Sequence, residues 1–387
     1  MALPVRMGDR PGHAERVRGV RGIPCRAARY PGRPAGREPV VEAARGLLVP
    51  RRRHGSQRRG DALRRSGRLP SARFRMRSRR PFRAGLLDLW KVQNTGDTTM
   101  MSLAEQKAFF EEEGYLVVEG VLSEDELAAC HEEIERLHRV SAELESAGDP
   151  ASSQFQREPY AKGANRPDGL PVLRKIENTR EISSFFRDLS VHPRLLRVVG
   201  GLLGPDLMLF RSTLMLKPAF HGSAHAPHQD SAYWPIEPPA LVTVSIALND
   251  ATTENGCFKV IPRSHTWGLK DWGLIAQAQD AEPAHERDLQ DAHQVEVPLK
   301  AGSALFFHSL MVHGSGPNRS PHPRNTALYA YFPPHVRYVP GKGGPREKTY
   351  PVACGLDGRK TFTLETAGQQ VQAGPGASSH VETKKVN

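Results

Sequence analysis

The sequence predicts a mainly β fold with flanking helices, either a β-sandwich or a jelly roll. Two helix-forming segments come first, and short apolar runs separated by Gly, Pro and Asn turns dominate from about residue 205 onward. Helices followed by many short strands are typical of a β domain that packs its helices outside the sheets. An Arg-rich stretch, residues 1–100, precedes this pattern and shows neither a helical nor a strand period.

Residues 1–100 differ from the rest of the chain in charge. They contain 25 Lys and Arg residues against 7 Asp and Glu, whereas the other residues hold 29 against 35. A segment this rich in Arg, Gly and Pro buries too little apolar surface to offset its ordering entropy, so we expect it to be disordered. We favour a start codon set too early, because Met100 and Met101 directly precede clear helix signals. A mitochondrial transit peptide and a nucleic-acid-binding arm are the alternatives, and no nucleic acid partner is expected.

Two helix starts follow this stretch. Ser102 and Glu105 have the S-x-x-E pattern of a capping box, and Ser123 and Glu126 repeat it. The first helix is expected to end at Gly114. The second is expected to bury one face, near the 3.6-residue period, that consists of Leu127, Cys130, Ile134 and Leu137.

Short apolar runs predict the strands. Residues 241–248 alternate loosely between apolar and small polar side chains, as a half-buried strand does. Further strands are expected at residues 115–118, 207–210, 214–216, 257–261, 303–307 and 327–332. We therefore expect the β domain to span residues 101–345 and residues 346–387 to form a polar C-terminal segment with a frayed tail.

The sequence gives no sign of a membrane protein. No run of about 18 apolar residues is present, so no membrane span is expected. The beginning lacks the short apolar region of a secretory signal. We expect a cytoplasmic protein.

A His-x-Asp/Glu pair occurs four times, and context separates the four. His13 lies in the Arg-rich stretch, His131 falls inside an amphipathic helix, and no histidine follows His380. Only His228 and Asp230 lie among predicted strands with further histidines downstream. Two histidines and one carboxylate form a facial triad that leaves positions on Fe(II) open for co-substrate and oxygen. The pair therefore predicts an iron site.

The third iron ligand could be His308 or His313. Spacing does not decide between them, because Arg319 follows His308 by the same interval at which Arg324 follows His313. His308 continues an apolar strand, whereas His313 precedes a Gly-Ser-Gly turn, where a ligand at the mouth of a barrel belongs. Arg324 leads directly into a strand, and a cation that grips a carboxylate inside a barrel should stand on a strand. We therefore predict His313 together with Arg324.

These residues resemble the phytanoyl-CoA dioxygenase family over roughly residues 102–340. With this resemblance, the predicted fold is mainly β with flanking helices around a double-stranded β-helix (jelly roll, cupin-like) core. The matching motifs include His228-Gln229-Asp230, Glu254-Asn255-Gly256-Cys257, Ile261-Pro262-Arg263-Ser264-His265, His308 to His313 and Arg324.

The resemblance implies a role for each matching position. His228, Asp230 and His313 would bind Fe(II), and Arg324 would bind the distal carboxylate of 2-oxoglutarate. Ser315 would also contact the co-substrate. Further positions that match co-substrate or pocket residues of family members are Lys175, Thr213, Ser245 and Trp234.

The implied activity is that of a 2-oxoglutarate-dependent dioxygenase. It would hydroxylate an unactivated C–H bond of a small organic substrate with O2 and release succinate and CO2, with ascorbate as an optional supporting reductant. The carboxylate of Asp230 disfavours halogenation, and the sequence lacks a peroxisomal tail, so a CoA thioester is not implied. The alternative is a non-catalytic or isomerase-type metal-binding cupin domain, which would need the histidines but not Arg324 and Ser315.

Overall fold

A computed structural model describes residues 101–270, 293–339 and 347–365, and the described residues from Leu103 onward belong to one compact unit. The predictions for residues 1–100 and 366–387 lie outside the described residues. No helix in the described part of the chain is long and apolar enough to cross a membrane.

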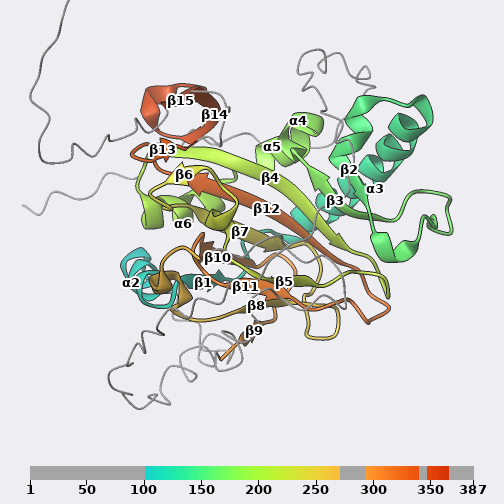
Figure 1. Cartoon of the computed structure of the whole chain (residues 1–387), viewed down its shortest axis with the longest axis horizontal. Helices are drawn as coiled ribbons and strands as arrows, with labels where there is room; N and C mark the ends of the chain where they lie inside the picture. Colours follow the sequence, from blue (N-terminus) through green and yellow to red (C-terminus); the bar gives the residue numbers. More distant parts are fainter. Residues whose placement is uncertain (1–100, 271–292, 340–346, 366–387) are drawn as a thin grey trace, which may run out of the picture. The chain divides into compact units, whose positions relative to one another are not determined.

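The elements follow one another in the predicted order, with helices first and most strands later (Figure 1). The α-helices are α2 (Leu103–Glu113), α3 (Glu124–Ala147), α4 (Thr179–Ile182), α5 (Ser184–Leu189) and α6 (Pro193–Leu203). Short 3-10 helices are η1 (Pro150–Gln154), η2 (Pro159–Ala161), η3 (Asp230–Ala232), η4 (Ser264–Trp267) and η5 (Leu356–Gly358). The strands are β1 (Tyr115–Val118), β2 (Phe155–Arg157), β3 (Leu173–Glu177), β4 (Leu207–Lys217), β5 (His225–His228), β6 (Ile236–Glu237), β7 (Val242–Ala247), β8 (Phe258–Val260), β9 (Val295–Val297), β10 (Ala304–His308), β11 (His313–Ser315), β12 (Arg324–Phe332), β13 (Arg337–Tyr338), β14 (Glu347–Cys354) and β15 (Thr361–Glu365).

Two antiparallel sheets position the site. Within the described residues, the major sheet has nine strands, in the order β1-β10-β7-β12-β4-β14-β15, with β3 paired to β4 and β2 to β3. The minor sheet has the order β5-β11-β8-β9, and β6 pairs with β13. The structure confirms a β-rich fold with flanking helices.

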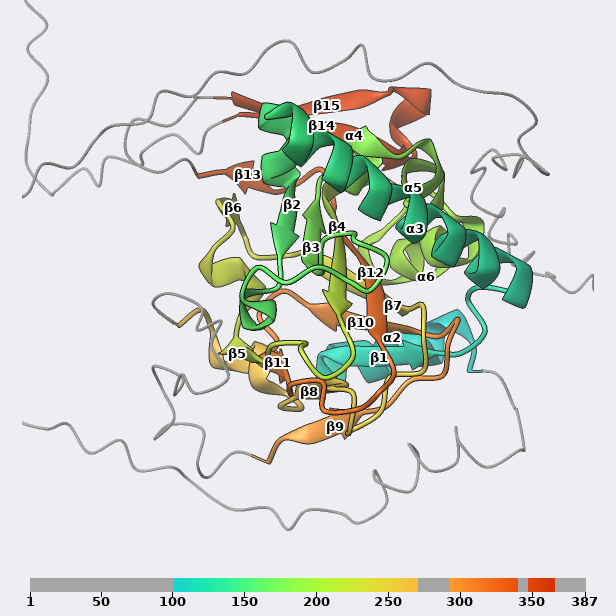
Figure 2. The ribbon, with the colours of Figure 1, turned by 90° about the vertical axis from the view of Figure 1, so that its right-hand side faces the viewer.

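The largest hydrophobic cluster among the described residues lies between the helices and the major sheet, whose ribbons are drawn in Figure 2. It joins buried residues of α3, α5 and α6 to alternate residues of β4, β7, β10 and β12. Two buried tyrosines of β12 link the layers by hydrogen bonds, because the Tyr329 hydroxyl donates to Phe186 O at 3.0 Å and the Tyr331 hydroxyl donates to Ser190 O at 2.6 Å. These bonds satisfy polar groups that burial would otherwise penalise.

The capping box of α3 is confirmed. The Ser123 hydroxyl accepts a hydrogen bond from the Glu126 backbone N–H at 3.3 Å, and the Glu126 carboxylate accepts one from the Ser123 backbone N–H at 2.8 Å. The helix ends at Ala147 and is capped by Gly148, whose φ of 64° is left-handed. The predicted apolar face is largely buried, with Leu127 packed at its edge and the fully buried positions Cys130, Ile134 and Leu137.

Two predictions about strands were wrong. Residues 207–210 and 214–216 form one strand, β4, because the polar residues between them take part in side-chain contacts rather than in a turn. The strand at residues 241–248 is not half-buried, since all six residues of β7 are buried. The helices cover one face of β7 and the minor sheet lies over the other, so no face meets solvent.

The sheet also extends beyond residue 345. Strand β14 pairs with the first residues of β4, and β15 pairs with β14. The polar character of residues 347–365 reflects strands at the edge of the sheet, which are exposed on much of their surface. The described C-terminal residues therefore belong to the same fold as the site.

Candidate metal centre

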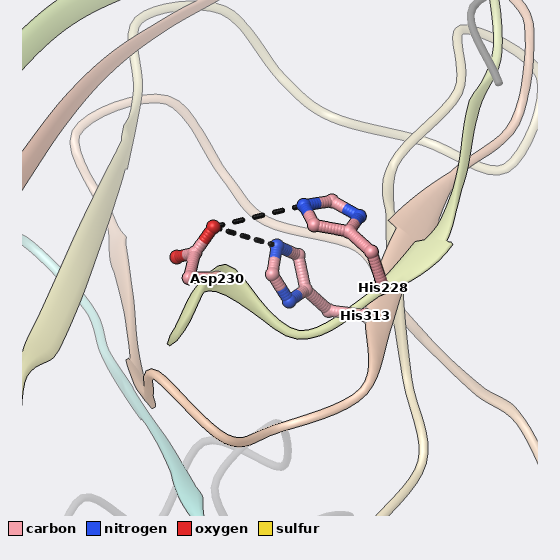
Figure 3. Close-up of side chains that lie close together, drawn as sticks. All are labelled: His228, Asp230 and His313. Carbon is pink, nitrogen blue, oxygen red and sulfur yellow. Dashed lines mark ion pairs between the residues drawn. The ribbon is translucent and has the colours of Figure 1, made fainter. Parts of the chain in front are cut away.

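Neighbouring strands of the minor sheet bring two histidines together. His228 ends β5, His313 begins β11, and the two are direct partners in the antiparallel ladder. Residues opposite each other in such a ladder have adjacent side chains, and the two imidazole centroids lie 4.3 Å apart. Asp230 follows at the start of η3 and turns its carboxylate toward both rings (Figure 3).

The three side chains form a cluster that can bind a metal ion. One ligand atom from each lies within 4.8 Å of the others. Asp230 Oδ1 is 3.6 Å from His228 Nε2 and 3.9 Å from His313 Nε2 (Figure 3). Two imidazole nitrogens and one carboxylate oxygen on the same side are the donor set that non-haem Fe(II) prefers. The residues therefore fit the ion that the sequence predicts.

Backbone carbonyls orient both imidazole rings. His228 Nδ1 lies 2.9 Å from Ala226 O, and His313 Nδ1 lies 3.0 Å from Met311 O. A carbonyl oxygen only accepts, so each Nδ1 carries the proton and each Nε2 presents its lone pair to the metal position. Burial, with a smaller contribution from His228, lowers the pKa of His313 to about 4, which keeps its imidazole neutral and able to bind metal.

Thr243 orients the carboxylate of Asp230. Its hydroxyl, on β7 of the major sheet, donates to Asp230 Oδ2 at 2.8 Å. This bond engages Oδ2, whereas Oδ1 faces the two histidines and is the oxygen placed to bind the metal. Sequence reasoning missed Thr243, because its contact depends on how the two sheets pack.

His308 lies outside this cluster. Its Nδ1 accepts a hydrogen bond from the Leu310 backbone N–H at 3.0 Å, and its ring packs near Phe110 and His265. Burial lowers the pKa of His308 to about 4. The structure thus places His313 beside His228 and Asp230 and leaves His308 in the packing between β10, α2 and η4.

The cluster opens into a cavity of about 160 Å³ between the two sheets. The predicted residues Lys175, Thr213, Trp234, Ser315 and Arg324 all line it. Ser245 does not, although it is buried on β7, and its hydroxyl has no hydrogen-bond partner within the described structure. The cavity therefore brings together every predicted site residue except Ser245.

Arg324 is buried at one end of the cavity. Its guanidinium donates to Gly256 O at 2.7 and 3.2 Å and to the Thr326 hydroxyl at 3.0 Å. It also lies 5.1 Å from the ring centroid of Phe258. Burial lowers the pKa of Arg324 to about 10, so it remains a cation at neutral pH. Arg319, by contrast, is exposed and does not line the cavity.

The Glu254–Cys257 motif builds the anchor for Arg324. The Asn255 side chain closes the turn. Its Oδ1 accepts a hydrogen bond from the Thr252 backbone N–H, and its Nδ2 donates one to Asp250 O, both at 2.7 Å. Gly256 then has a φ of 83°, and a Cβ on it would lie 2.3 Å from Gly316 O. Only glycine fits this close approach of two chain segments, which turns the Gly256 carbonyl toward Arg324.

Lys217 is a second buried basic residue beside Arg324, and sequence reasoning missed it. The two residues are direct partners on β4 and β12. The Lys217 ammonium donates to Ser223 O at 2.7 Å and to Gly316 O. Burial, and then the charge of Arg324, hold the pKa of Lys217 well below its ordinary value. Lys217 and Thr213 both have odd numbers on β4, so their side chains lie on the same face of the strand. This alternation is the signal from which Lys217 could have been predicted.

Lys175 and Thr213 are tied to an ionic cluster on the same wall. Lys175 forms an ion pair with Glu177, and the Thr213 hydroxyl donates to Glu177 at 3.0 Å. Arg211 donates to both oxygens of Glu177, at 2.7 and 3.0 Å. Arg174, next to Lys175, also lines the cavity. Glu177, Arg211 and Arg174 were not predicted from the sequence.

The Ile261–His265 motif supports the segment that leads to His313. The Ser264 hydroxyl accepts from the Val312 backbone N–H at 2.8 Å. Arg263, with a left-handed φ of 66°, forms ion pairs with Glu112 at 2.7 Å and Glu113 at 2.6 Å on α2. The motif therefore holds a metal ligand in place without touching the metal position.

A metal-ligand triad and a buried arginine inside one β-rich core define a class, the non-haem metal enzymes that use an anionic co-substrate. The model of the phytanoyl-CoA dioxygenase (PhyH) family matches residues 110–326, and the chain belongs to this family of Fe(II)- and 2-oxoglutarate-dependent dioxygenases. The predicted resemblance is thereby confirmed.

Individual relatives support the same assignment. The peroxisomal phytanoyl-CoA dioxygenase of Rattus norvegicus is 29% identical over 271 residues, covering 66% of this chain and 76% of the relative. The ectoine dioxygenase of Streptomyces avermitilis is 29% identical over 262 residues, covering 63% and 82%. The crystal structure of SnoK, a non-heme alpha ketoglutarate dependent carbocyclase from nogalamycin biosynthesis, has a TM-score of 0.51 at 23% identity, covers 69% of this chain and 97% of that chain, and supports the fold alone.

Proposed function

We propose that the protein couples the oxidative decarboxylation of 2-oxoglutarate to the hydroxylation of an unactivated C–H bond in a small organic substrate, releasing succinate and CO2. One observation carries the proposal, namely that the His228, Asp230 and His313 cluster and the buried Arg324 line a single cavity. A metal site alone would not need a buried guanidinium whose hydrogen bonds, among the described residues, go to a carbonyl and a hydroxyl rather than to a carboxylate.

The chain supplies binding and orientation. His228 and His313 would hold Fe(II) through Nε2 and Asp230 through Oδ1, and the bound iron supplies the activation of dioxygen that C–H hydroxylation requires. The carbonyls at Nδ1 and the hydroxyl of Thr243 keep these donors aligned before the metal binds. Such outer contacts tune metal affinity as well as geometry.

Arg324 would bind the far carboxylate of 2-oxoglutarate. Its planar fork of donors suits a carboxylate, and a charge-assisted pair is strong where water is excluded. The bonds to Gly256 and Thr326 restrict its rotation, so little conformational entropy is lost when the co-substrate binds. Ser315 lines the same cavity and is the candidate for a second contact. Lys175, Thr213 and Trp234 are further candidates, whereas we do not assign Ser245 a contact.

Succinate release tests this function. The full chain would be loaded with Fe(II) and supplied with 2-oxoglutarate, ascorbate, O2 and a panel of organic compounds. Asp230→Ala is expected to abolish iron binding and succinate formation together. Arg324→Met is expected to raise the KM for 2-oxoglutarate about tenfold or more, because one charged hydrogen-bonding group is lost.

Arg319→Met is the matched control. Arg319 is exposed and follows His308 at the same interval at which Arg324 follows His313, so this variant should retain the wild-type KM. Normal succinate release by Asp230→Ala would show that the metal assignment is wrong. Metal binding without any binding or turnover of 2-oxoglutarate would instead indicate an isomerase-type or non-catalytic cupin domain.

A further inference from the structure

The cavity wall formed by β3, β4 and β12 is strongly basic. Asp230 is the only carboxylate among the described lining residues, whereas four lining side chains besides the buried Lys217 are basic, namely Arg174, Lys175, Arg211 and Arg324. The charges of Fe(II) and of the 2-oxoglutarate dianion cancel, so loading the site with both leaves the positive charge of the wall in place. A further anion is therefore favoured in the loaded cavity.

The strand register separates two cationic positions in this wall. Arg324 lies opposite Lys217, and Arg211 lies opposite Ala330. Six positions along β4 separate Lys217 from Arg211, which corresponds to roughly 20 Å at about 3.3 Å per residue. A five-carbon diacid that reaches the Arg324 end cannot also reach Arg211.

Arg211 lies level with the metal cluster rather than with Arg324. Ala330 is the direct partner of Arg211 on one side and of Thr243 on the other, and Thr243 holds the Asp230 carboxylate. The co-substrate would extend from the metal toward Arg324, away from the row of paired residues Arg211, Ala330 and Thr243. Ala330 carries only a methyl group, so the row leaves room in the cavity between Arg211 and Asp230.

Arg211 keeps donor capacity inside the fold. It shares the single carboxylate of Glu177 with Lys175, so two cations have one anion between them. Its Nε donates to Thr213 at 3.0 Å and its Nη2 to Glu177, while Nη1 bonds to no protein atom among the residues described. The guanidinium can therefore accept a second oxyanion in the cavity.

The aromatic residues after Asp230 supply an apolar surface to the same cavity. Tyr233 and Trp234 both line it, and Trp234 is held by Phe210 at a centroid distance of 4.8 Å. Tyr233 lies 6.0 Å from the His228 ring. A ligand that contacts both Arg211 and these rings needs an acidic group and an apolar body.

We propose that the substrate is an amphipathic organic acid whose carboxylate or phosphate group binds Arg211, with its apolar part against Tyr233 and Trp234. This inference rests on the proposed function, since it assigns the substrate class of the same site. It places the acidic group level with the metal cluster and away from the Arg324 end, and it disfavours cationic and wholly apolar substrates.

Calorimetric titration of the loaded enzyme tests the proposal. Under anaerobic conditions the full chain carrying Fe(II) and 2-oxoglutarate is titrated with aryl and alkyl carboxylic acids, with their methyl esters, and with phosphate monoesters of the matching alcohols. Some acids are expected to bind about tenfold or more tightly than their esters, because the esters lose a charge-assisted bond. The phosphate arm distinguishes the two oxyanions.

Three variants separate the residues. Arg211→Met should weaken acid binding at least tenfold more than it weakens 2-oxoglutarate binding, and Arg324→Met should show the reverse order. Glu177→Gln should strengthen acid binding, because it removes the anion that competes for Arg211. Arg359→Met makes the same chemical change at an exposed position outside the cavity and should bind the acids as the wild type does.

The outcomes distinguish this inference from the proposed function. If Fe(II)-dependent binding of 2-oxoglutarate is absent, the proposed function fails whatever the acids do. If 2-oxoglutarate binds through Arg324 but the acids bind no better than their esters, the substrate class alone is wrong. Acids that displace 2-oxoglutarate, or that bind equally well to Arg211→Met, also overturn the inference.

Discussion

At the scale of single residues, Thr243 shows how one hydroxyl defines a metal ligand. A carboxylate can bind a metal through one oxygen or both, and the 2.8 Å bond from Thr243 occupies Asp230 Oδ2. The remaining oxygen then faces the two imidazoles. Thr243 is buried, so water cannot replace its hydroxyl without rearrangement.

Removing this hydroxyl should weaken metal binding. Thr243→Val is expected to lower Fe(II) affinity about 10- to 100-fold, as loss of an outer contact to a ligand does, whereas Thr243→Ser should restore most of it. Anaerobic competition with a chelator measures the affinity. Thr326→Val serves as a control, since its hydroxyl contacts Arg324 and not a metal ligand. Equal affinities for the Thr243→Val variant and the wild-type protein would contradict the role.

His308 predicts a pH dependence of stability. Burial lowers its pKa in the fold to about 4, against about 6.5 in an unfolded chain. Below about pH 6.5 His308 is protonated in the unfolded state but stays neutral in the native state. The unfolding free energy therefore falls as the pH drops toward 4. When the pH is lowered from about 7.5 to about 5, the titration of His308 should therefore decrease the unfolding free energy by about 2 kcal/mol.

The measurement is urea denaturation of the metal-free protein at these two pH values. His308→Gln removes the titrating ring, so its stability should fall by about 2 kcal/mol less than that of the wild type over the same interval. His313 titrates in both proteins and cancels in the comparison. An identical pH dependence in the two proteins would show that His308 is not the group responsible.

At the scale of elements, the segment before β11 depends on a buried serine. Ser264 in η4 accepts the Val312 N–H at 2.8 Å, one residue before His313. Ser264→Ala leaves this buried N–H without an acceptor and should lower unfolding free energy by about 1–3 kcal/mol. It should also weaken Fe(II) binding, because the ligand strand loses a support.

The matched control is Ser153→Ala. Ser153 also makes one hydroxyl bond, to Pro150 O at 2.8 Å, but at an exposed position. Its loss should change stability by less than about 0.5 kcal/mol. Chemical denaturation measures the stability of both variants, and chelator competition measures their Fe(II) affinity. Equal effects of the two substitutions would show that Ser264 does not support the segment before β11.

Local signals in the sequence predicted α2, α3 and several strands, but not α4, α5, α6 or the short strands β2, β3 and β5. Long-range pairing accounts for part of what they missed. The capping box of α3 depends on four consecutive residues and could be predicted from them. The continuity of β4 could not, because Arg211 and Thr213 look like a polar break until β3 supplies Glu177. The burial of both faces of β7 depends on the second sheet, which no local period encodes.

The same reason divides the site. His228 and Asp230 are two residues apart and could be found as a motif. His313 was chosen through Arg324, which leads into a predicted strand, and through a predicted turn at residues 314–316, where the structure instead has the strand β11. Thr243 and Glu177 reach the site through strand register and sheet packing. Such contacts depend on residues far apart in the chain, so no spacing in the sequence indicates them.

At the scale of the whole molecule, the candidate site joins the two sheets. His228 and His313 lie on the minor sheet, whereas Thr243, Lys217 and Arg324 lie on the major sheet. Unfolding of either sheet takes the site apart. Ligands that bind the assembled cavity must therefore stabilise the entire domain.

Thermal unfolding should reveal two separate stabilising steps. Fe(II), added anaerobically, should raise Tm, and 2-oxoglutarate should raise it again, each by about 2.7 kcal/mol of unfolding free energy at a hundredfold excess over Kd. Arg324→Met should keep the metal step and lose most of the second. A second step that persists in this variant would place the co-substrate elsewhere.

The carbonyls of Ala226 and Met311 give the metal centre a form of mutational robustness. Each lies two residues before the histidine it orients, and each belongs to the main chain. No amino-acid exchange at either position deletes a carbonyl, so tautomer choice at both imidazoles survives every point mutation that preserves the local fold. Variants that lose the metal through misoriented ligands should therefore cluster at the ligands and at side-chain supports such as Thr243, whereas exchanges at Ala226 and Met311 should act through packing rather than through the tautomers of the two histidines.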